Sequence, residues 1–134
     1  MKKEDNILEV TNILLEGTNK KFKSVFIDKL GKGVLGECTI GKNYPFICNL
    51  YIDNFHFEDF DPDFILETII HECHHCCYMD QYCNFSINNE LFINLAQFNN
   101  FFESGAYSCN IITMNAIKNK DKIYELIRSL DIKD

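Results

Sequence analysis

The chain has 134 residues, near the commonest size of one domain, and we expect a single globular unit over residues 1–134. A hydrophobic content of 46% excludes a disordered chain, and a formal net charge of −7 argues against sequence-independent nucleic-acid binding, which relies on clustered Lys and Arg. No apolar run approaches a membrane span and the N-terminal residues lack the apolar region of a signal peptide, so we expect a cytoplasmic protein without a membrane partner.

The first half of the chain predicts one helix followed by a small sheet. Apolar residues at helical spacing predict an amphipathic helix from Asp5 to Glu16, which Gly17 ends. Three strands are predicted, at Ser24–Leu30, Val34–Ile40 and Phe46–Asp53. The last two form a hairpin through residues 41–45, and a basic cluster lies in a solvated turn before the first strand: Lys20, Lys21 and Lys23. We expect an antiparallel sheet.

A second helix begins with a strong start signal. Asp61 is suited to the N-cap, Pro62 to the first helical position, and Asp63 adds an acidic residue to the first turn. The run from Phe64 to Tyr82 then contains neither Gly nor Pro. Apolar residues recur along it at the spacing of a buried stripe: Leu66, Ile69, Ile70, Cys73, Cys76 and Cys77. An adjacent face carries Thr68, His71, His75 and Tyr78.

Residues 71–75 of this helix read His-Glu-Cys-His-His, which matches the HExxH arrangement of zinc peptidases. On a helix, His71 and His75 lie one turn apart on the same side and can bind one metal ion. Zn²⁺ in a hydrolytic site takes three protein ligands and keeps a fourth position for water. A carboxylate that is not a ligand must take the proton as water attacks, and Glu72 is our choice for that general base.

The third ligand must come from elsewhere, and no histidine follows His75. The downstream candidates are Asp80, Cys83, Glu90, Glu103, Cys109 and Glu125. Glu103 is the best of them because it interrupts an apolar helical segment, where an unpaired carboxylate is costly to bury. A solvent-facing Glu103 at a bend near Gly105 is the alternative reading. Tyr107, one turn later, could donate to an oxyanion or simply pack in the core.

Two further helices are expected after the motif. Ser86 caps the first, whose helical pattern continues past Gly105 toward Ala116. Residues 118–121 form a polar break, and the last helix runs from about Lys122 to Leu130. Its inner side carries Ile123, Leu126, Ile127 and Leu130. The expected fold class is therefore α+β, with a small antiparallel three-stranded sheet packed on the motif helix and on further helices.

The order of these elements, the motif helix over residues 66–75 and the later Glu103-Ser104-Gly105-Ala106 resemble the minimal gluzincin metallopeptidases, and among these the ImmA/IrrE-type peptidases. That resemblance implies a zincin-like fold, zinc at His71, His75 and Glu103, Glu72 as base, and a protein substrate such as a regulator or repressor. The region 35–38 is also similar to SprT-type metalloproteases. That family usually takes a third histidine downstream, which this chain lacks.

Two functions of different classes follow. The first is a zinc-dependent metallopeptidase, in which an exposed edge of the strand at 46–53 could pair with an extended peptide substrate. The second is a non-catalytic structural zinc-binding or interaction module built from the Cys/His cluster at 73–77, with Cys38 or Cys48. The odd count of seven cysteines indicates reduced thiols, most of them small core residues. A structural module would give Glu72 no purpose.

Overall fold

The structure is a computed structural model and describes residues 2–41, 44–77 and 110–131. The described ranges form four α-helices and a three-stranded mixed sheet, which confirms the α+β class. In chain order the elements are α1 (Lys3–Leu14), β1 (Lys21–Asp28), β2 (Gly36–Gly41), β3 (Tyr44–Asp53), the 3₁₀ helix η1 (Asn54–Phe57), α2 (Pro62–Cys77), α6 (Asn110–Lys118), α7 (Lys120–Arg128) and the 3₁₀ helix η3 (Ser129–Asp131). The expectation of a single domain over 1–134 stays a prediction.

The sheet is not purely antiparallel, and this part of the prediction was wrong. The strand order is β1-β3-β2, with β3 antiparallel to β2 and parallel to β1. The hairpin between β2 and β3 is as expected, but β1 lies beside β3, two strands later in the chain. Burial gives the physical reason, because Cys48, Leu50 and Ile52 of β3 are almost completely enclosed. A strand with that buried face is best placed in the centre, where both of its edges are paired.

A β-bulge in β1 explains why this strand begins earlier than expected. The pairing with β3 shifts register between Phe22 and Ser24, so that Phe22 and Val25, three residues apart, both enter the core. The basic cluster is consequently not a solvated turn. Lys21 and Lys23 are exposed on the strand, whereas Lys20 is only 5% exposed. Because of the bulge, apolar and polar residues do not alternate strictly at the start of β1. The sequence pattern therefore did not predict this part of the strand.

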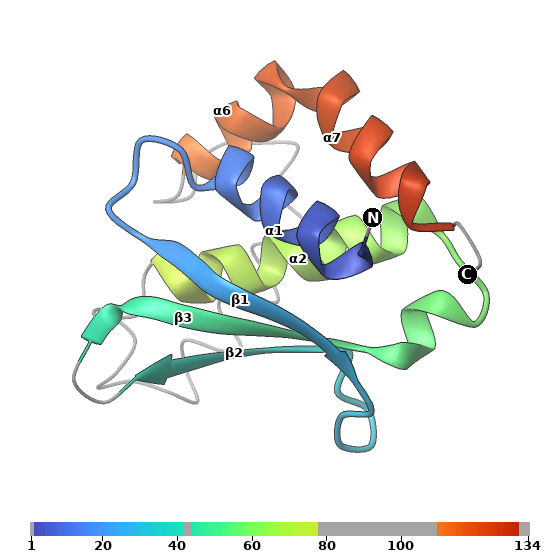
Figure 1. The fold of residues 1–134 in the computed structure, drawn as a ribbon. Coiled ribbons are helices and arrows are strands. Elements are labelled where there is room, and N and C mark those ends of the chain that lie inside the picture. The colour runs from blue at the N-terminus through green and yellow to red at the C-terminus, as the bar shows by residue number, and fades with distance from the viewer. Residues whose placement is uncertain (1, 42–43, 78–109, 132–134) are drawn as a thin grey trace.

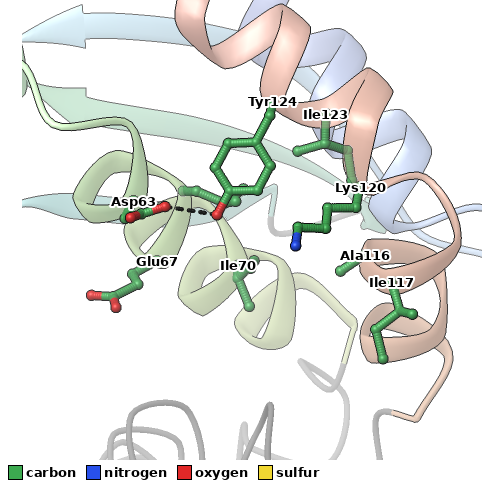
Figure 2. A pocket seen from close by; sticks show the side chains of 9 residues that line it. Asp63, Glu67, Ile70, Ala116, Ile117, Lys120, Ile123 and Tyr124 are labelled. Atoms are coloured by element: carbon green, nitrogen blue, oxygen red, sulfur yellow. Dashed lines mark hydrogen bonds between the residues drawn. The ribbon is translucent and has the colours of Figure 1, made fainter.

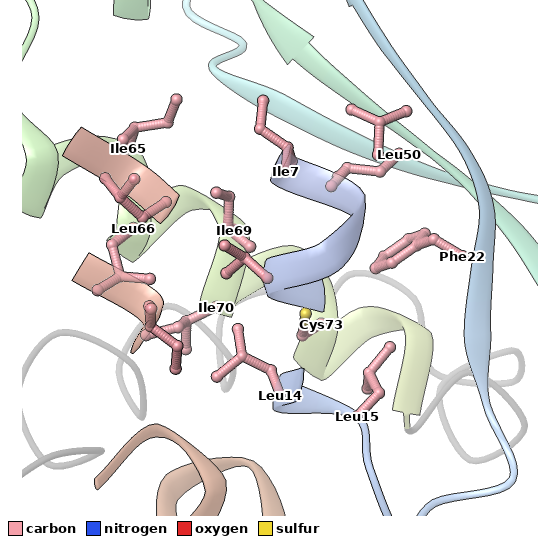
Figure 3. Packing of buried hydrophobic residues seen from close by; sticks show 14 of the residues in the cluster. Ile7, Leu14, Leu15, Phe22, Leu50, Ile65, Leu66, Ile69, Ile70 and Cys73 are labelled. Atoms are coloured by element: carbon pink, nitrogen blue, oxygen red, sulfur yellow. The ribbon is translucent and has the colours of Figure 1, made fainter. Parts of the chain in front are cut away.

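The helices share one side of the sheet, and the core lies between the two layers (Figure 1). Figure 3 shows the packing at its centre, where Ile69, Ile70 and Cys73 of α2 meet Leu14 of α1. Helix α1 ends as predicted, since Gly17 adopts a φ of +87° that side-chain-bearing residues rarely take. Among the described residues, no helix is both long enough and apolar enough to cross a membrane.

The last two helices follow the predicted pattern. Helix α7 and η3 bury the residues expected on the inner side, Ile123, Leu126, Ile127 and Leu130. The polar break is a single residue, Asn119, whose side chain donates to the carbonyl of Asn115 in α6. The helix predicted to begin at Ser86 falls mostly on residues 78–109, which lie outside the described ranges. Only its end, α6, can be compared.

Candidate metal centre

Helix α2 brings the two motif histidines together as the sequence predicts. Its start is fixed by Asp61, whose side-chain Oδ1 accepts the backbone N–H of Asp63 at 3.0 Å. In the second half of the same helix, the Nε2 atoms of His71 and His75 lie 3.1 Å apart. The two rings meet edge to face, with centroids 4.8 Å apart, and both side chains are partly exposed. The pair is therefore reachable from solvent.

Glu72 occupies a different environment from the histidines beside it. It is 4% exposed and faces β2, where its Oε2 and Cγ atoms lie 3.3 Å from the position that a Cβ on Gly36 would take. Glu residues are rarely buried in proteins, and this one lies beside two half-exposed imidazoles. Glu72 directly follows His71 on the helix, and its role as general base stays a prediction.

Glu72 is the middle residue of a row on α2 that packs on the sheet edge. Thr68, Glu72 and Cys76 are spaced four residues apart, and such residues lie along one side of a helix. Thr68 is bonded to His56 of η1 through its Oγ1, 3.1 Å from the His56 Nε2 atom, and it donates to the Phe64 carbonyl. At the other end of the row, Cys76 donates to Cys48 of β3, with 3.5 Å between the sulfur atoms.

Three thiols gather at that end of the row: Cys38 of β2, Cys48 of β3 and Cys76 of α2. Hydrogen bonds to Cys48 and Cys76, together with burial, raise the pKa of Cys38 far above its ordinary value. Burial likewise raises the pKa of Cys73, which is completely enclosed. Thiols of this kind stay protonated and act as small core residues. This agrees with the structural role expected for most cysteines.

His74 is the buried histidine of the motif. It is 4% exposed, and burial together with the nearby His71 and His75 lowers its pKa to about 4. Burial also lowers the pKa of His56, against an opposing effect of Asp53. Both rings are consequently neutral near pH 7. Of the four histidines in the chain, only His71 and His75 are accessible.

The histidine pair fits a zinc ion in ligand type and in spacing. With Zn–N bonds of 2.0–2.1 Å and tetrahedral angles, two ligand nitrogens stand roughly 3.3 Å apart, close to the 3.1 Å between His71 and His75. Within the described ranges no group of three or more His, Cys, Asp or Glu side chains is arranged to hold a metal ion. A complete site therefore needs a ligand from outside those ranges.

Most candidates for that ligand cannot be placed. Glu103, the preferred third ligand, lies outside the described residues, and so do Tyr107, Asp80, Cys83, Glu90 and Cys109. Glu125 is described and is exposed on α7. Of the predicted ligands His71, His75 and Glu103, the described residues thus include only the two histidines, which lie close together.

The described surface also holds a cavity of about 440 Å³ between the first half of α2 and helices α6 and α7 (Figure 2). Tyr124 donates a hydrogen bond of 2.7 Å to Asp63 at its rim, and this bond raises the pKa of Tyr124 to about 12. Ile70, Ala116 and Ile123 form part of its apolar wall. His71 and His75 do not line it, so this cavity is separate from the motif chemistry.

Sequence analysis missed two residues that support the motif, His56 and Gly36. The sequence pattern gave no role to His56, which is 2% exposed and hydrogen-bonded to Thr68. The only sequence signal for this contact was that Thr68 lies on the same helix face as His71. Gly36 lies more than thirty residues before the motif and contacts it only in the folded protein. The local sequence pattern around Gly36 does not indicate such a contact. The strand at 46–53 was equally compatible with pairing to a substrate or with completing the sheet, and the second holds, because β3 is paired on both edges.

Comparison of the chain with models of known families, with curated proteins and with solved structures gave no match.

Proposed function

We propose that this protein is a zinc-dependent metallopeptidase with a zincin-like fold, acting on a protein or peptide substrate in the cytoplasm. One observation carries the proposal: two accessible imidazole nitrogens converge within 3.1 Å beside a carboxylate that is almost fully buried. Converging imidazoles suit Zn²⁺, and an adjacent carboxylate that is not needed as a ligand suits a general base. The similarity of the motif helix to ImmA/IrrE-type peptidases supports the same reading.

Each residue of the motif would have a separate role in peptide hydrolysis. His71 and His75 would hold the metal, with Glu103 as the third ligand. Zinc held there would lower the pKa of a coordinated water to roughly 7 and polarise the substrate carbonyl. Glu72 would accept the proton of the attacking water and deliver it to the leaving amine. Its burial keeps this carboxylate in one orientation, so that little reorganisation is needed when the proton moves.

The edge of β2 is where we expect an extended substrate to bind. Within the described residues β2 pairs with β3 alone, so its other edge has backbone groups available for pairing. The close approach of Glu72 to Gly36 puts this strand next to the proposed base. A peptide added to β2 by main-chain hydrogen bonds would therefore lie along the motif helix. A regulator or repressor with an extended, accessible segment would suit this mode of binding.

Metal analysis of purified variants tests the proposal directly. We expect one zinc per chain in the wild type, loss of zinc in His75→Ala and Glu103→Ala, and retention in Glu72→Gln. Retention is expected because the base does not ligate the metal. Wild-type protein that binds no zinc after incubation with it, and that cleaves no peptide, would refute the proposal.

Activity can be measured without knowing the substrate. A proteome-derived peptide library is incubated with zinc-loaded wild type and with Glu72→Gln, and new termini are identified by mass spectrometry. We expect cleavages that depend on the wild-type enzyme and vanish in Glu72→Gln. Equal cleavage by the two proteins would point to a contaminating protease and would count against the proposal.

The thiol cluster favours a second candidate, a structural zinc module. Cys38, Cys48 and Cys76 are close together, and zinc in structural sites prefers thiolates. The raised pKa values of Cys38 and Cys76 and the absence of a three-ligand group in the described part of the chain argue against it. Zinc that survives His75→Ala but is lost in Cys76→Ser would select this module over the peptidase.

A further inference from the structure

The motif helix packs closely against the sheet at Gly36, the first residue of β2. A Cβ added to Gly36 would lie 2.7 Å from Cγ2 of Thr68 and 3.3 Å from both Cγ and Oε2 of Glu72. The first distance is impossible without movement, and the second is tighter than ordinary van der Waals contact. The backbone of Gly36 does not adopt a positive φ, so alanine is excluded by space and not by conformation.

Neither partner at this contact can easily move away. On one side of Glu72, Thr68 is tied to the buried His56 by a hydrogen bond of 3.1 Å. On the other side, Cys76 contacts Cys48 of the central strand, and Cys38, two residues after Gly36, is hydrogen-bonded to both thiols. The helix is thus fixed on both flanks of Glu72, to η1 through Thr68 and to the sheet through Cys76. A larger residue at position 36 must displace the side chains of Thr68 and Glu72 themselves.

We propose that Gly36 is a positioning residue for Glu72: its lack of a side chain lets the Glu72 carboxylate lie against the edge strand, where the peptide substrate pairs. This inference rests on the proposed function, because it assigns Glu72 the role of base. It also gives a physical reason for a glycine as the first residue of β2.

The test distinguishes the two contacts that a side chain at position 36 would make, one with Thr68 and one with Glu72. Gly36→Ala alone is ambiguous, because the contact with Thr68 could unfold the protein. Thr68→Ser removes the Cγ2 atom and keeps the Oγ1 bonded to His56, so that of the three atoms nearest to the added Cβ of Gly36→Ala only the two of Glu72 remain. Gly31→Ala is the matched glycine control, since its Cβ would meet only Val34 at 3.7 Å, an ordinary contact.

Two readouts follow Glu72 in these variants. The first is the ¹³C chemical shift of its side-chain carboxyl in metal-free protein labelled at glutamate, assigned by its absence in Glu72→Gln. The second is kcat on the peptide cleaved best in the library. Between Thr68→Ser and the double variant we expect the resonance to move and kcat to fall at least tenfold. The zinc content and the melting temperature should stay close to those of Thr68→Ser, and Gly31→Ala should behave as wild type.

An unchanged resonance together with an unchanged kcat in a folded double variant would overturn the role of Gly36 and leave the peptidase standing. Because the chemical shift needs no activity, it also decides the question if the wild type proves inactive. A resonance that moves in a protein without zinc or peptidase activity would keep Gly36 as the positioning residue of Glu72 and reject the proposed reaction alone.

Discussion

The two sides of helix α2 differ in what their residues contact. One side, which includes Ile65, Ile69 and Cys73, is completely enclosed by apolar neighbours (Figure 3). The other carries a buried carboxylate, Glu72, and two half-exposed imidazoles within one turn of each other. The first side can be explained by the stability of the core alone. The second side gathers ionisable side chains within one helical turn, and such clusters are candidates for a functional site.

Removing the charge of Glu72 should give the largest effect, and it should fall on activity. We expect Glu72→Gln to lower kcat by roughly 10²–10⁴-fold, the usual contribution of a general base, because the amide cannot accept the proton. Zinc content and unfolding free energy should change little. Steady-state kinetics with metal analysis checks this. Full activity in a zinc-loaded Glu72→Gln protein would show that Glu72 is not the general base.

A truncation on the opposite side should act on stability. Ile69 is fully buried, and Ile69→Ala should lower the free energy of unfolding by about 2–5 kcal/mol through lost apolar contact and the cavity left behind. Urea denaturation of the metal-free protein measures this. Zinc content per folded chain should match the wild type. If Ile69→Ala were as stable as wild type but had lost its zinc, the apolar side would serve metal binding and not stability.

His74 should make the metal-free protein sensitive to mild acid. Its folded-state pKa is about 4 against an ordinary value of 6.5, so the unfolded chain binds the proton more readily between these values. Stability should therefore fall by roughly 3 kcal/mol as the pH drops from about 6.5 to about 4. Denaturation at several pH values would show a shallower fall in His74→Gln than in wild type. Parallel curves would mean that His74 is protonated equally in both states.

The smallest effect is expected at Thr68, which lies on the polar side yet has a structural partner. Thr68→Val keeps the shape of the side chain and removes its hydroxyl, so the ring of the buried His56 loses the hydrogen bond of 3.1 Å. We expect a loss of about 1–3 kcal/mol in unfolding free energy, the cost of an unsatisfied buried polar group. Thermal melts with Thr68→Ser as control check this. Equal losses in Thr68→Ser and Thr68→Val would show that the hydroxyl is not responsible.

Local signals in the sequence were enough for the helices and for half of the site. The N-cap at Asp61, the end of α1 near Gly17 and the meeting of His71 with His75 each depend on residues within a few positions of one another. The features that were wrong or missed depend on distant contacts. The parallel pairing of β1 with β3, the bulge in β1 and the approach of Gly36 to Glu72 are decided by packing between elements. Glu103 stays a prediction.

The strand order has a consequence for how the chain folds during synthesis. Strand β1 leaves the ribosome before β2 and β3, yet its only partner in the described sheet is β3, through pairs such as Lys21 with Ile47. Until β3 exists, Phe22 and Val25 have no sheet to join. Helix α1 is made earlier and packs on β1, so it can shield this apolar face in the meantime. We therefore expect chains that lack residues 3–14 to aggregate while they are being made.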